Sequence, residues 1–358
     1  MNVPGIMSGM VLTGHGGPER LEWRDDLPVP EPGEGEVLVR VGASSVNNTD
    51  INLRVGWYSK SVRGDTAAGT ADGFGADVDA DGGWSGEALA FPHIQGADCC
   101  GRIVAAGPGV GAGRVGQRVL VRALQSPPSP DAQVAVTTLG TDYDGAFAEY
   151  TKVRSNDAIL IDSPLSDTDL ASFPCAFSTA EGMIQRVRLG AERVLITGAS
   201  GGVGSAAVQL AGRRGARVTA LTSAAKAADL RALGAEETLD RDADLPEGAF
   251  DVVIDLVGGP RWPELLETLR SGGRYVTAGA IAGPIVELDL RTLYLRDLTL
   301  FGCTHQPDSV FTDLVRYIEA GEIRPLVAET YPLRELHAAQ EAFLSKSHIG
   351  KIAIRVRN

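Results

Sequence analysis

The feature that most constrains the fold is the stretch VLITGASGGVGSAAVQL, residues 194–210, which joins an apolar run to a helical pattern through small residues. The run VLI is typical of a buried strand. Apolar residues then recur at the i, i+3, i+4 and i+7 spacing of one helix face: Val203, Ala206, Ala207 and Leu210. A strand, a glycine turn and a helix N-terminus together offer an anion free backbone N–H groups and the positive end of the helix dipole. The stretch therefore predicts a dinucleotide phosphate site, although Ala199 stands at the first position of G-x-G-x-x-G.

The rest of the chain falls into two patterns. With 358 residues, two domains are expected. Before about residue 157, short alternating runs such as GEVLVRVGAS are bounded by glycine and proline, which predicts a small antiparallel barrel. From residue 158, apolar runs such as RVTALTS and FDVVIDLVG alternate with helical segments, as in a parallel sheet. The closing strand, GKIAIRV, is expected to return to the first domain, giving domains of 1–157 with 305–358 and of 158–304.

Composition excludes several classes of partner. The net charge of −13 argues against nucleic acid and against an anionic membrane surface. No apolar run reaches the ~18 residues of a membrane span, and the first residues lack the pattern of a signal peptide. The four cysteines, two of them adjacent, suggest reduced thiols, so a cytoplasmic location is expected.

Residues 64–87 stand apart, because they are rich in Gly, Ala and Asp and contain no basic residue. Such a segment cannot form a core of its own. A solvated insertion is the first interpretation. The alternative is a substrate lid that carries Phe74 and Trp84.

Seven motifs in this order resemble the medium-chain dehydrogenase/reductase superfamily: SSVNNTDINLRVG, HIQGADCCGRIVAAGPGV, GQRV, GAFAEY, CAFSTAEGM, GASGGVG and IGKIAIRV. The resemblance spans the chain apart from residues 64–87. It implies an α/β protein with a GroES-like β-barrel catalytic domain, a doubly wound Rossmann domain and an active site in the cleft between them. The TGxxxGxG pattern of short-chain dehydrogenases also fits residues 197–204, but no tyrosine here has a lysine four residues on, as that family requires.

The resemblance also bears on zinc. Zinc members of the superfamily hold a catalytic metal through a cysteine, a histidine and a second cysteine, at positions that match Asn47, Ala97 and Cys175 here. One remaining ligand cannot hold zinc. The four clustered cysteines of a structural zinc site are also missing. The chain thus resembles the zinc-independent quinone oxidoreductase and enoyl reductase branch, and no metal is expected.

In that branch, Asn47 and Asp50 are expected near the nicotinamide, Asn47 as a hydrogen-bond donor and Asp50 either touching substrate or orienting loops. Cys175 is either a small hydrophobic residue of the cleft wall or a proton donor, and Asp98 is expected to be structural. Tyr58, Trp57 and His93 are candidates for substrate contact, with packed or core roles as their alternatives, and Tyr58 or water is the expected proton source.

The cofactor is expected to be NADPH. An NAD-specific fold places Asp or Glu ~20 residues past the glycines, for the ribose 2′-hydroxyl. Thr222 and Ser223 stand there instead, and Lys226 supplies a cation for a 2′-phosphate. The residues expected to bind the cofactor, several of them through the resemblance alone, are Thr179, Ser200, Gly201, Gly202, Val203, Gly204, Thr222, Ser223, Lys226, Gly279 and Lys351.

These expectations combine into one function: an NADPH-dependent reductase that adds hydride to a conjugated C=C bond of a small molecule such as an enone, a quinone or a polyene carbonyl. The resulting enolate is then protonated or closes a ring. Two alternatives stay open, a non-catalytic NADPH-binding protein of the crystallin type and an alcohol or carbonyl dehydrogenase. A homodimer is expected from the resemblance.

Overall fold

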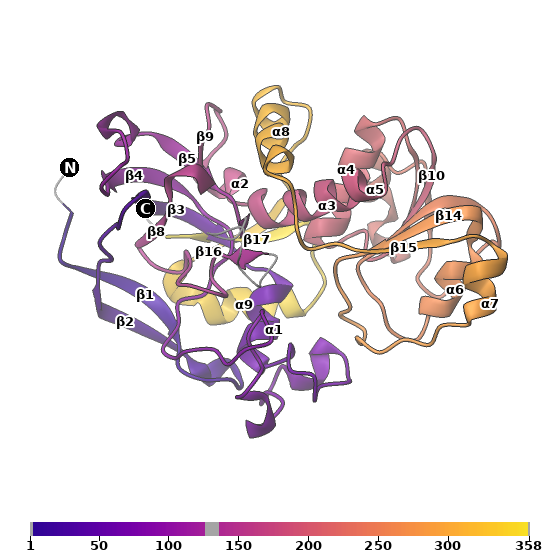
Figure 1. Ribbon diagram of the computed structural model, residues 1–358, viewed down its shortest axis with the longest axis horizontal. Coiled ribbons are helices and arrows are strands. Elements are labelled where there is room, and N and C mark those ends of the chain that lie inside the picture. The colour runs from indigo at the N-terminus through magenta and orange to yellow at the C-terminus, as the bar shows by residue number, and fades with distance from the viewer. Residues whose placement is uncertain (1–2, 126–135, 357–358) are drawn as a thin grey trace. The chain divides into compact units, whose positions relative to one another are not determined.

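The computed structural model describes residues 3–125 and 136–356, and its chain forms two compact units (Figure 1). The first unit contains Met1–Val62, Gly69–Cys175 and Pro307–Asn358, and the second contains Arg63–Ala68 and Ala176–Gln306. The first and the last described stretches of the chain therefore both belong to the first unit.

A seven-stranded sheet organises the first unit. Its order is β16-β17-β3-β4-β5-β9, with β8 also paired to β3, and all pairs except β16–β17 are antiparallel. The strands are β3 (Glu36–Ser45), β4 (Cys100–Ala106), β5 (Arg118–Val121), β8 (Tyr150–Arg154), β9 (Ala158–Leu160), β16 (Val327–Pro332) and β17 (Lys351–Arg355). Val37, Val39 and Val41 of β3 are fully buried on one face, as their alternation predicts.

Further elements surround this sheet. Two antiparallel pairs add β1 (Ile6–Leu12) with β2 (Leu21–Pro28), and β6 (Leu124–Gln125) with β7 (Thr137–Thr138). The helices are α1 (Asn48–Val55), α2 (Asp167–Leu170), α8 (Asp308–Glu319) and α9 (Leu336–Leu344). Five short 3₁₀ helices among the described residues lie wholly in this unit: Pro18–Arg20, Ala76–Val78, Ala112–Arg114, Ser155–Asp157 and Leu333–Glu335. Another, Thr66–Gly69, is shared between the two units, and Ala224–Lys226 belongs to the second unit.

The second unit is built on a six-stranded parallel sheet of order β12-β11-β10-β13-β14-β15. The strands are β10 (Arg193–Ile196), β11 (Arg217–Leu221), β12 (Glu237–Leu239), β13 (Phe250–Asp255), β14 (Leu269–Thr277) and β15 (Thr299–Gly302). Its helices are α3 (Pro174–Arg186, begun in the first unit), α4 (Gly202–Arg213), α5 (Ala227–Ala232), α6 (Trp262–Glu267) and α7 (Leu290–Leu295). In Figure 1, α4 and α5 lie on one side of this sheet and α6 and α7 on the other.

This strand order is that of a Rossmann fold, and the order reverses at β10 and β13. Ligands of such sheets bind at the carboxyl ends of the strands beside the reversal, where the glycine turn follows β10. The expected fold class is confirmed. None of the described helices is both long and apolar enough to cross a membrane.

Candidate functional site

The glycine turn of the second unit is shaped for a close backbone approach. Gly198 has a φ of +58°, which disfavours other residues, and a Cβ on Gly204 would lie 2.2 Å from the Gly198 oxygen. Helix α4 begins at Gly202 with Gly201 at its N-cap, and no side chain caps it. The first N–H groups of α4, from Gly202 and Val203 onward, are therefore left for an external anion, and Ser200 lies directly before them.

Below this turn lies a buried carboxylate that the sequence pattern did not indicate. Asp255, at the end of β13, is fully buried and accepts hydrogen bonds of 2.6 Å from both the Thr197 and the Tyr275 hydroxyls. The N–H groups of Val257 and Gly258 donate to it as well. This network connects the ends of β10, β13 and β14 by hydrogen bonds. It thereby holds Thr197, the residue directly before Gly198 of the turn, in place.

The end of β11 presents a polar corner. The Thr222 hydroxyl is buried and has no hydrogen-bond partner among the described residues. Ser223 and Lys226 follow it, and burial together with the positive charge of Arg241 lowers the pKa of Lys226. Two cations beside an orphaned hydroxyl suit a phosphate group. Arg241 was not identified from the sequence, because this residue follows β12, whereas the dinucleotide motif concerns only the residues at the end of β11.

Two further expected cofactor residues lie in the second unit. Thr179 is half-buried on α3. Gly279 follows β14, and its carbonyl accepts a hydrogen bond of 3.1 Å from the Thr277 hydroxyl. Gly279 is therefore held at the carboxyl end of the sheet, as are the turn and the Thr222 corner.

Lys351 lies elsewhere, in a buried polar cluster of the first unit. Its ammonium donates to the Asp98 carboxylate at 2.9 Å and to the Asn47 side-chain oxygen at 2.5 Å. Asp98 is fully buried and accepts three more hydrogen bonds, from the Ser45 hydroxyl, the Asn47 amide and the Cys175 backbone N–H. Asp98 is thus structural, as expected, and it links β3, β17 and α3.

The Asn47 amide is fully engaged within this cluster. Its Nδ2 donates to Asp98 at 2.8 Å and to the Ser45 carbonyl at 3.2 Å, while its oxygen accepts from Lys351. Both N–H groups are therefore used internally. The expectation that Asn47 donates directly to substrate is corrected by this geometry.

Asp50 fixes the start of α1. Its carboxylate accepts from the backbone N–H of Asn47 at 2.8 Å, as in a capping box, and from that of Gly96 at 3.2 Å. Burial raises the pKa of Asp50 to about 7, against the opposing effect of these hydrogen bonds. These hydrogen bonds suit the orienting role considered for Asp50, while contact with substrate stays a prediction.

Cys175 is the partly exposed member of this neighbourhood. Burial, followed by the negative charge of Asp98, raises the pKa of its thiol to about 12. The thiol is thus protonated at neutral pH. A protonated thiol retains a proton to donate.

Tyr58 belongs to an aromatic group with Trp57 and Trp84. Its ring centroid lies 5.7 Å from that of Trp57 and 5.0 Å from that of Trp84, both with edge-to-face geometry. Burial raises the pKa of Tyr58, whose hydroxyl bonds to Thr49 and Asn52. Tyr58 is therefore protonated and held beside the N-terminal half of α1.

The acidic segment 64–87 is not solvated throughout. Val78 is fully buried and packs so closely that a Cβ on Gly56 would lie 2.3 Å from it. Asp81 accepts a hydrogen bond from the backbone N–H of Lys60, and Trp84 covers the edge of Tyr58. The interpretation as a purely solvated insertion is wrong for these positions, and the contact of Trp84 with Tyr58 agrees with the alternative.

His93 has a core role. Its backbone pairs with Leu12 in both directions, and its ring lies 3.5 Å from the Asp144 carboxylate. Burial lowers its pKa. His93 therefore connects β1 to a neighbouring loop as a buried histidine.

The residues at the matching metal positions do not fit zinc. Asn47 is bonded to an ammonium group and Ala97 offers only a methyl group, so Cys175 is the one remaining ligand of the three positions. Among residues 3–125 and 136–356, no three His, Cys, Asp or Glu side chains group as metal ligands. A positive charge bonded to one ligand position also repels a metal ion.

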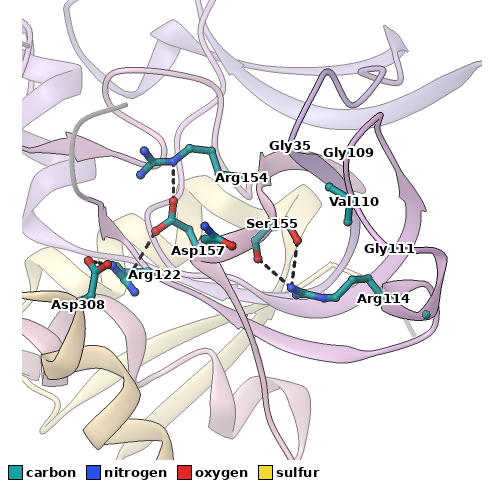
Figure 2. Close-up of a pocket in the computed structure, with 12 residues that line it drawn as sticks. Gly35, Gly109, Val110, Gly111, Arg114, Arg122, Arg154, Ser155, Asp157 and Asp308 are labelled. Atoms are coloured by element: carbon teal, nitrogen blue, oxygen red, sulfur yellow. Dashed lines mark hydrogen bonds and ion pairs between the residues drawn. The ribbon is translucent and has the colours of Figure 1, made fainter. Parts of the chain in front are cut away.

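A cavity of about 640 Å³ lies in another part of the first unit (Figure 2). Arg154 donates to Asp157 at 2.7 Å, and Arg122 lies between Asp157 and Asp308. Arg114 donates to main-chain oxygens of Ser155 and Ala158. The arginines that line this cavity are thus paired with acidic side chains or backbone oxygens nearby. None of the expected site residues lines the cavity.

Comparisons with known proteins agree with this architecture. Residues 33–163 match the alcohol dehydrogenase GroES-like domain, and residues 207–354 match a zinc-binding dehydrogenase model. An acryloyl-coenzyme A reductase from Metallosphaera sedula is 28% identical over 97% of this chain and 99% of its own. A quinone oxidoreductase from Lama guanicoe is 26% identical over 98% of each chain.

Solved structures share the fold closely. One from Sinorhizobium meliloti 1021, provisionally described as an alcohol dehydrogenase, is 43% identical, with a TM-score of 0.88 over 99% of this chain and 97% of its own. Among structures with the same fold but under 25% identity, one holds NAD and another NADP.

Proposed function

Because the chain belongs to the medium-chain dehydrogenase/reductase superfamily, we propose that it is an NADPH-dependent, zinc-independent reductase that transfers hydride to a conjugated C=C bond. The coarser conclusion is an oxidoreductase that uses a nicotinamide cofactor and acts on a small molecule. The finer one rests on a single observation, the buried Lys351–Asn47–Asp98 cluster, in which a lysine ammonium is bonded to Asn47, the residue that matches one ligand position of the zinc-dependent branch.

This cluster favours a conjugated acceptor over a simple ketone. Reduction of a ketone places a full negative charge on oxygen, which zinc stabilises as a Lewis acid in the metal-dependent branch. When hydride adds to the β-carbon of a conjugated carbonyl, the charge spreads into an enolate. Orientation and hydrogen-bond donors then suffice to lower the barrier. The names of the acryloyl-coenzyme A reductase and quinone oxidoreductase relatives agree with such acceptors.

The residues that would hold the cofactor fit a phosphorylated dinucleotide. When bound, NADPH supplies the hydride. The uncapped start of α4 suits the pyrophosphate. Thr222, Ser223, Lys226 and the newly identified Arg241 suit the 2′-phosphate, and Thr179 and Gly279 are proposed cofactor contacts.

The enolate oxygen and the α-carbon need a donor and a proton. Tyr58 and Cys175 are both protonated at neutral pH, so either they or water can supply the proton. An enone, a quinone or a polyene carbonyl satisfies this chemistry. Ring closure of the enolate within a larger substrate is an alternative to its protonation.

We also propose a cytoplasmic homodimer. None of the four cysteines, all of which lie among the described residues, is in a disulfide, which fits a reducing compartment. The outer edge of β15 has no strand partner among the described residues, and apolar side chains are exposed in the segment 285–295, which precedes β15 in the chain: Ile285, Val286, Leu290, Tyr294 and Leu295. A second copy related by a twofold axis would pair with this edge and cover these side chains.

A matched pair of acceptors tests the function. The purified protein with NADPH is expected to reduce 2-cyclohexenone and 1,4-benzoquinone but not cyclohexanone, which lacks the conjugated bond. Reduction of cyclohexanone with NADPH, or oxidation of cyclohexanol with NADP⁺, without turnover of the conjugated acceptors would establish the alcohol dehydrogenase alternative, which the description of the Sinorhizobium meliloti relative favours. Tight NADPH binding without turnover of any of these compounds would establish the crystallin-type alternative.

A further inference from the structure

The buried cluster contains one donor that its own acceptors do not saturate. An ammonium group has three N–H donors. Those of Lys351 meet two acceptors, Asn47 Oδ1 and Asp98 Oδ2, within the part of the chain that the structure describes. Lys351 is only 3% exposed, so bulk water does not readily supply the third acceptor. A buried donor without an acceptor is costly, and a ligand oxygen relieves that cost.

The surrounding groups hold the Lys351 side chain in place. Asp98 gives it a counter-ion, but the Asp98 carboxylate also accepts from Ser45, Asn47 and the Cys175 N–H. Asn47 adds a neutral acceptor on another side of the ammonium. The lysine is therefore fixed at two of its three N–H groups, which is the preorganisation that an oxyanion donor requires.

The side chains near Lys351 indicate the side from which a ligand would reach it. Cys175 is partly exposed and lies within electrostatic reach of Lys351 and of Asp50. Tyr58 lies within reach of Cys175, and Trp84 covers the edge of its ring. A thiol thus lies in the electrostatic neighbourhood of the buried ammonium, and an aromatic group lies in that of the thiol; both suit an apolar conjugated ligand.

We propose that Lys351 is a catalytic residue that donates its third N–H to the carbonyl oxygen of the acceptor, which extends the reductase function proposed above. Hydride adds to the β-carbon, the C=C electron pair moves to the carbonyl oxygen, and the Lys351 N–H takes up the resulting charge by hydrogen bonding. Water protonates the α-carbon, and Lys351 keeps its own proton throughout. Lys351 supplies the positive charge that zinc supplies in the metal-dependent branch, and Asn47 and Asp98 act as positioning residues.

The first test is Lys351→Met, measured with 2-cyclohexenone and NADPH. Loss of one oxyanion donor is expected to lower kcat by about 10²–10³-fold, while the Kd of NADPH, followed by tryptophan fluorescence, changes by less than ~3-fold. Because the change leaves Asp98 without its counter-ion, Lys351→Met with Asp98→Asn provides a neutral cluster that folds, and it shows the same loss. Lys152→Met, at an exposed lysine paired with Glu36, is the matched control and keeps full activity.

The second test asks whether Asn47 acts through Lys351. Asn47→Ala is expected to lower kcat about tenfold in the native background but less than twofold in the Lys351→Met background, since coupled residues are non-additive. Ethylamine is expected to restore activity to Lys351→Ala, which a purely structural role would not produce.

Several outcomes would overturn the proposal: a kcat within threefold of the native value in both Lys351→Met proteins, a loss confined to the Kd of NADPH, or additive losses with Asn47→Ala. If the native protein reduces only cyclohexanone, the proposed function fails, and the same variants on that ketone still test Lys351, because its oxygen carries the same charge. If the native protein reduces nothing, both proposals fail.

Discussion

The Lys351 ammonium donates a hydrogen bond to the Asn47 side-chain oxygen across 304 positions of the chain. Strand pairing brings them together, because β17 begins at Lys351 and lies antiparallel to β3, with Ala353 opposite Ser45. Asn47 lies two residues after the end of β3. The last strand of the chain thereby delivers a cation to a position that holds a metal ligand in zinc-dependent relatives.

This contact predicts a metal-free protein. The Asn47 oxygen is bonded to an ammonium group and Ala97 has no ligand atom, so Cys175 is left as a single ligand, which cannot hold zinc. Elemental analysis of purified protein is expected to find no stoichiometric zinc, and prolonged EDTA treatment should leave its activity unchanged. One tightly bound zinc per chain, lost together with activity, would disprove this prediction.

A preference for NADPH over NADH follows from the corner at the end of β11. Lys226→Ala and Arg241→Ala should each weaken NADPH binding by ~1–3 kcal/mol, the value of a charge-assisted hydrogen bond, and leave NADH binding nearly unchanged. Isothermal titration with both cofactors measures this. Arg217→Ala, at the opposite end of β11, is the control and should affect neither. Equal weakening of both cofactors would mean that these side chains do not bind the 2′-phosphate.

Asp50 should make stability depend on pH. Its pKa of about 7 in the folded protein lies above the ~3.9 of an unfolded chain, so the folded state binds the proton more tightly. The resulting stabilisation is present below about pH 4 and is lost as pH rises to about 7, at up to about 1.4 kcal/mol per pH unit. Urea unfolding at pH 5 and pH 8 should show Asp50→Asn gaining stability relative to the native protein at the higher pH. The exposed Asp72→Asn is the control, and an equal difference at both pH values would contradict the raised pKa.

The exposed apolar segment before β15 predicts a dimer. Sedimentation equilibrium should give twice the 37.5 kDa of the chain. Leu290→Asp with Leu295→Asp should shift the protein towards monomer, since both side chains are more than 60% exposed and charges there oppose burial. Ile6→Asp, an equally exposed apolar position in the first unit, should leave the dimer intact. An unchanged dimer in the double variant would place the interface elsewhere.

The local elements of the fold were predictable from the sequence. The alternation in β3 and the strand, turn and helix of residues 194–210 depend on neighbouring residues, so they could be read directly. The Asn47–Lys351 contact could not be derived in this way, because it depends on which strands pair. Arg241 was missed for a related reason, since β11 and β12 are adjacent in the sheet while the motif follows only one of them.

Composition misled the interpretation of residues 64–87. A Gly- and Asp-rich segment is usually solvated, yet Val78 and Trp84 give it two points of attachment, to Gly56 and to the ring of Tyr58. Single apolar residues among many small ones carry little periodic signal. Their burial becomes evident only in the folded chain.

The position of a transferred deuterium tests the central claim most directly. With NADPH deuterated at the transferred position and 2-cyclohexenone as acceptor, NMR of the product should find the label on the carbon β to the carbonyl, because hydride adds to the C=C bond. Label on the carbinol carbon would show that the protein reduces the carbonyl itself, and the proposed function would be wrong.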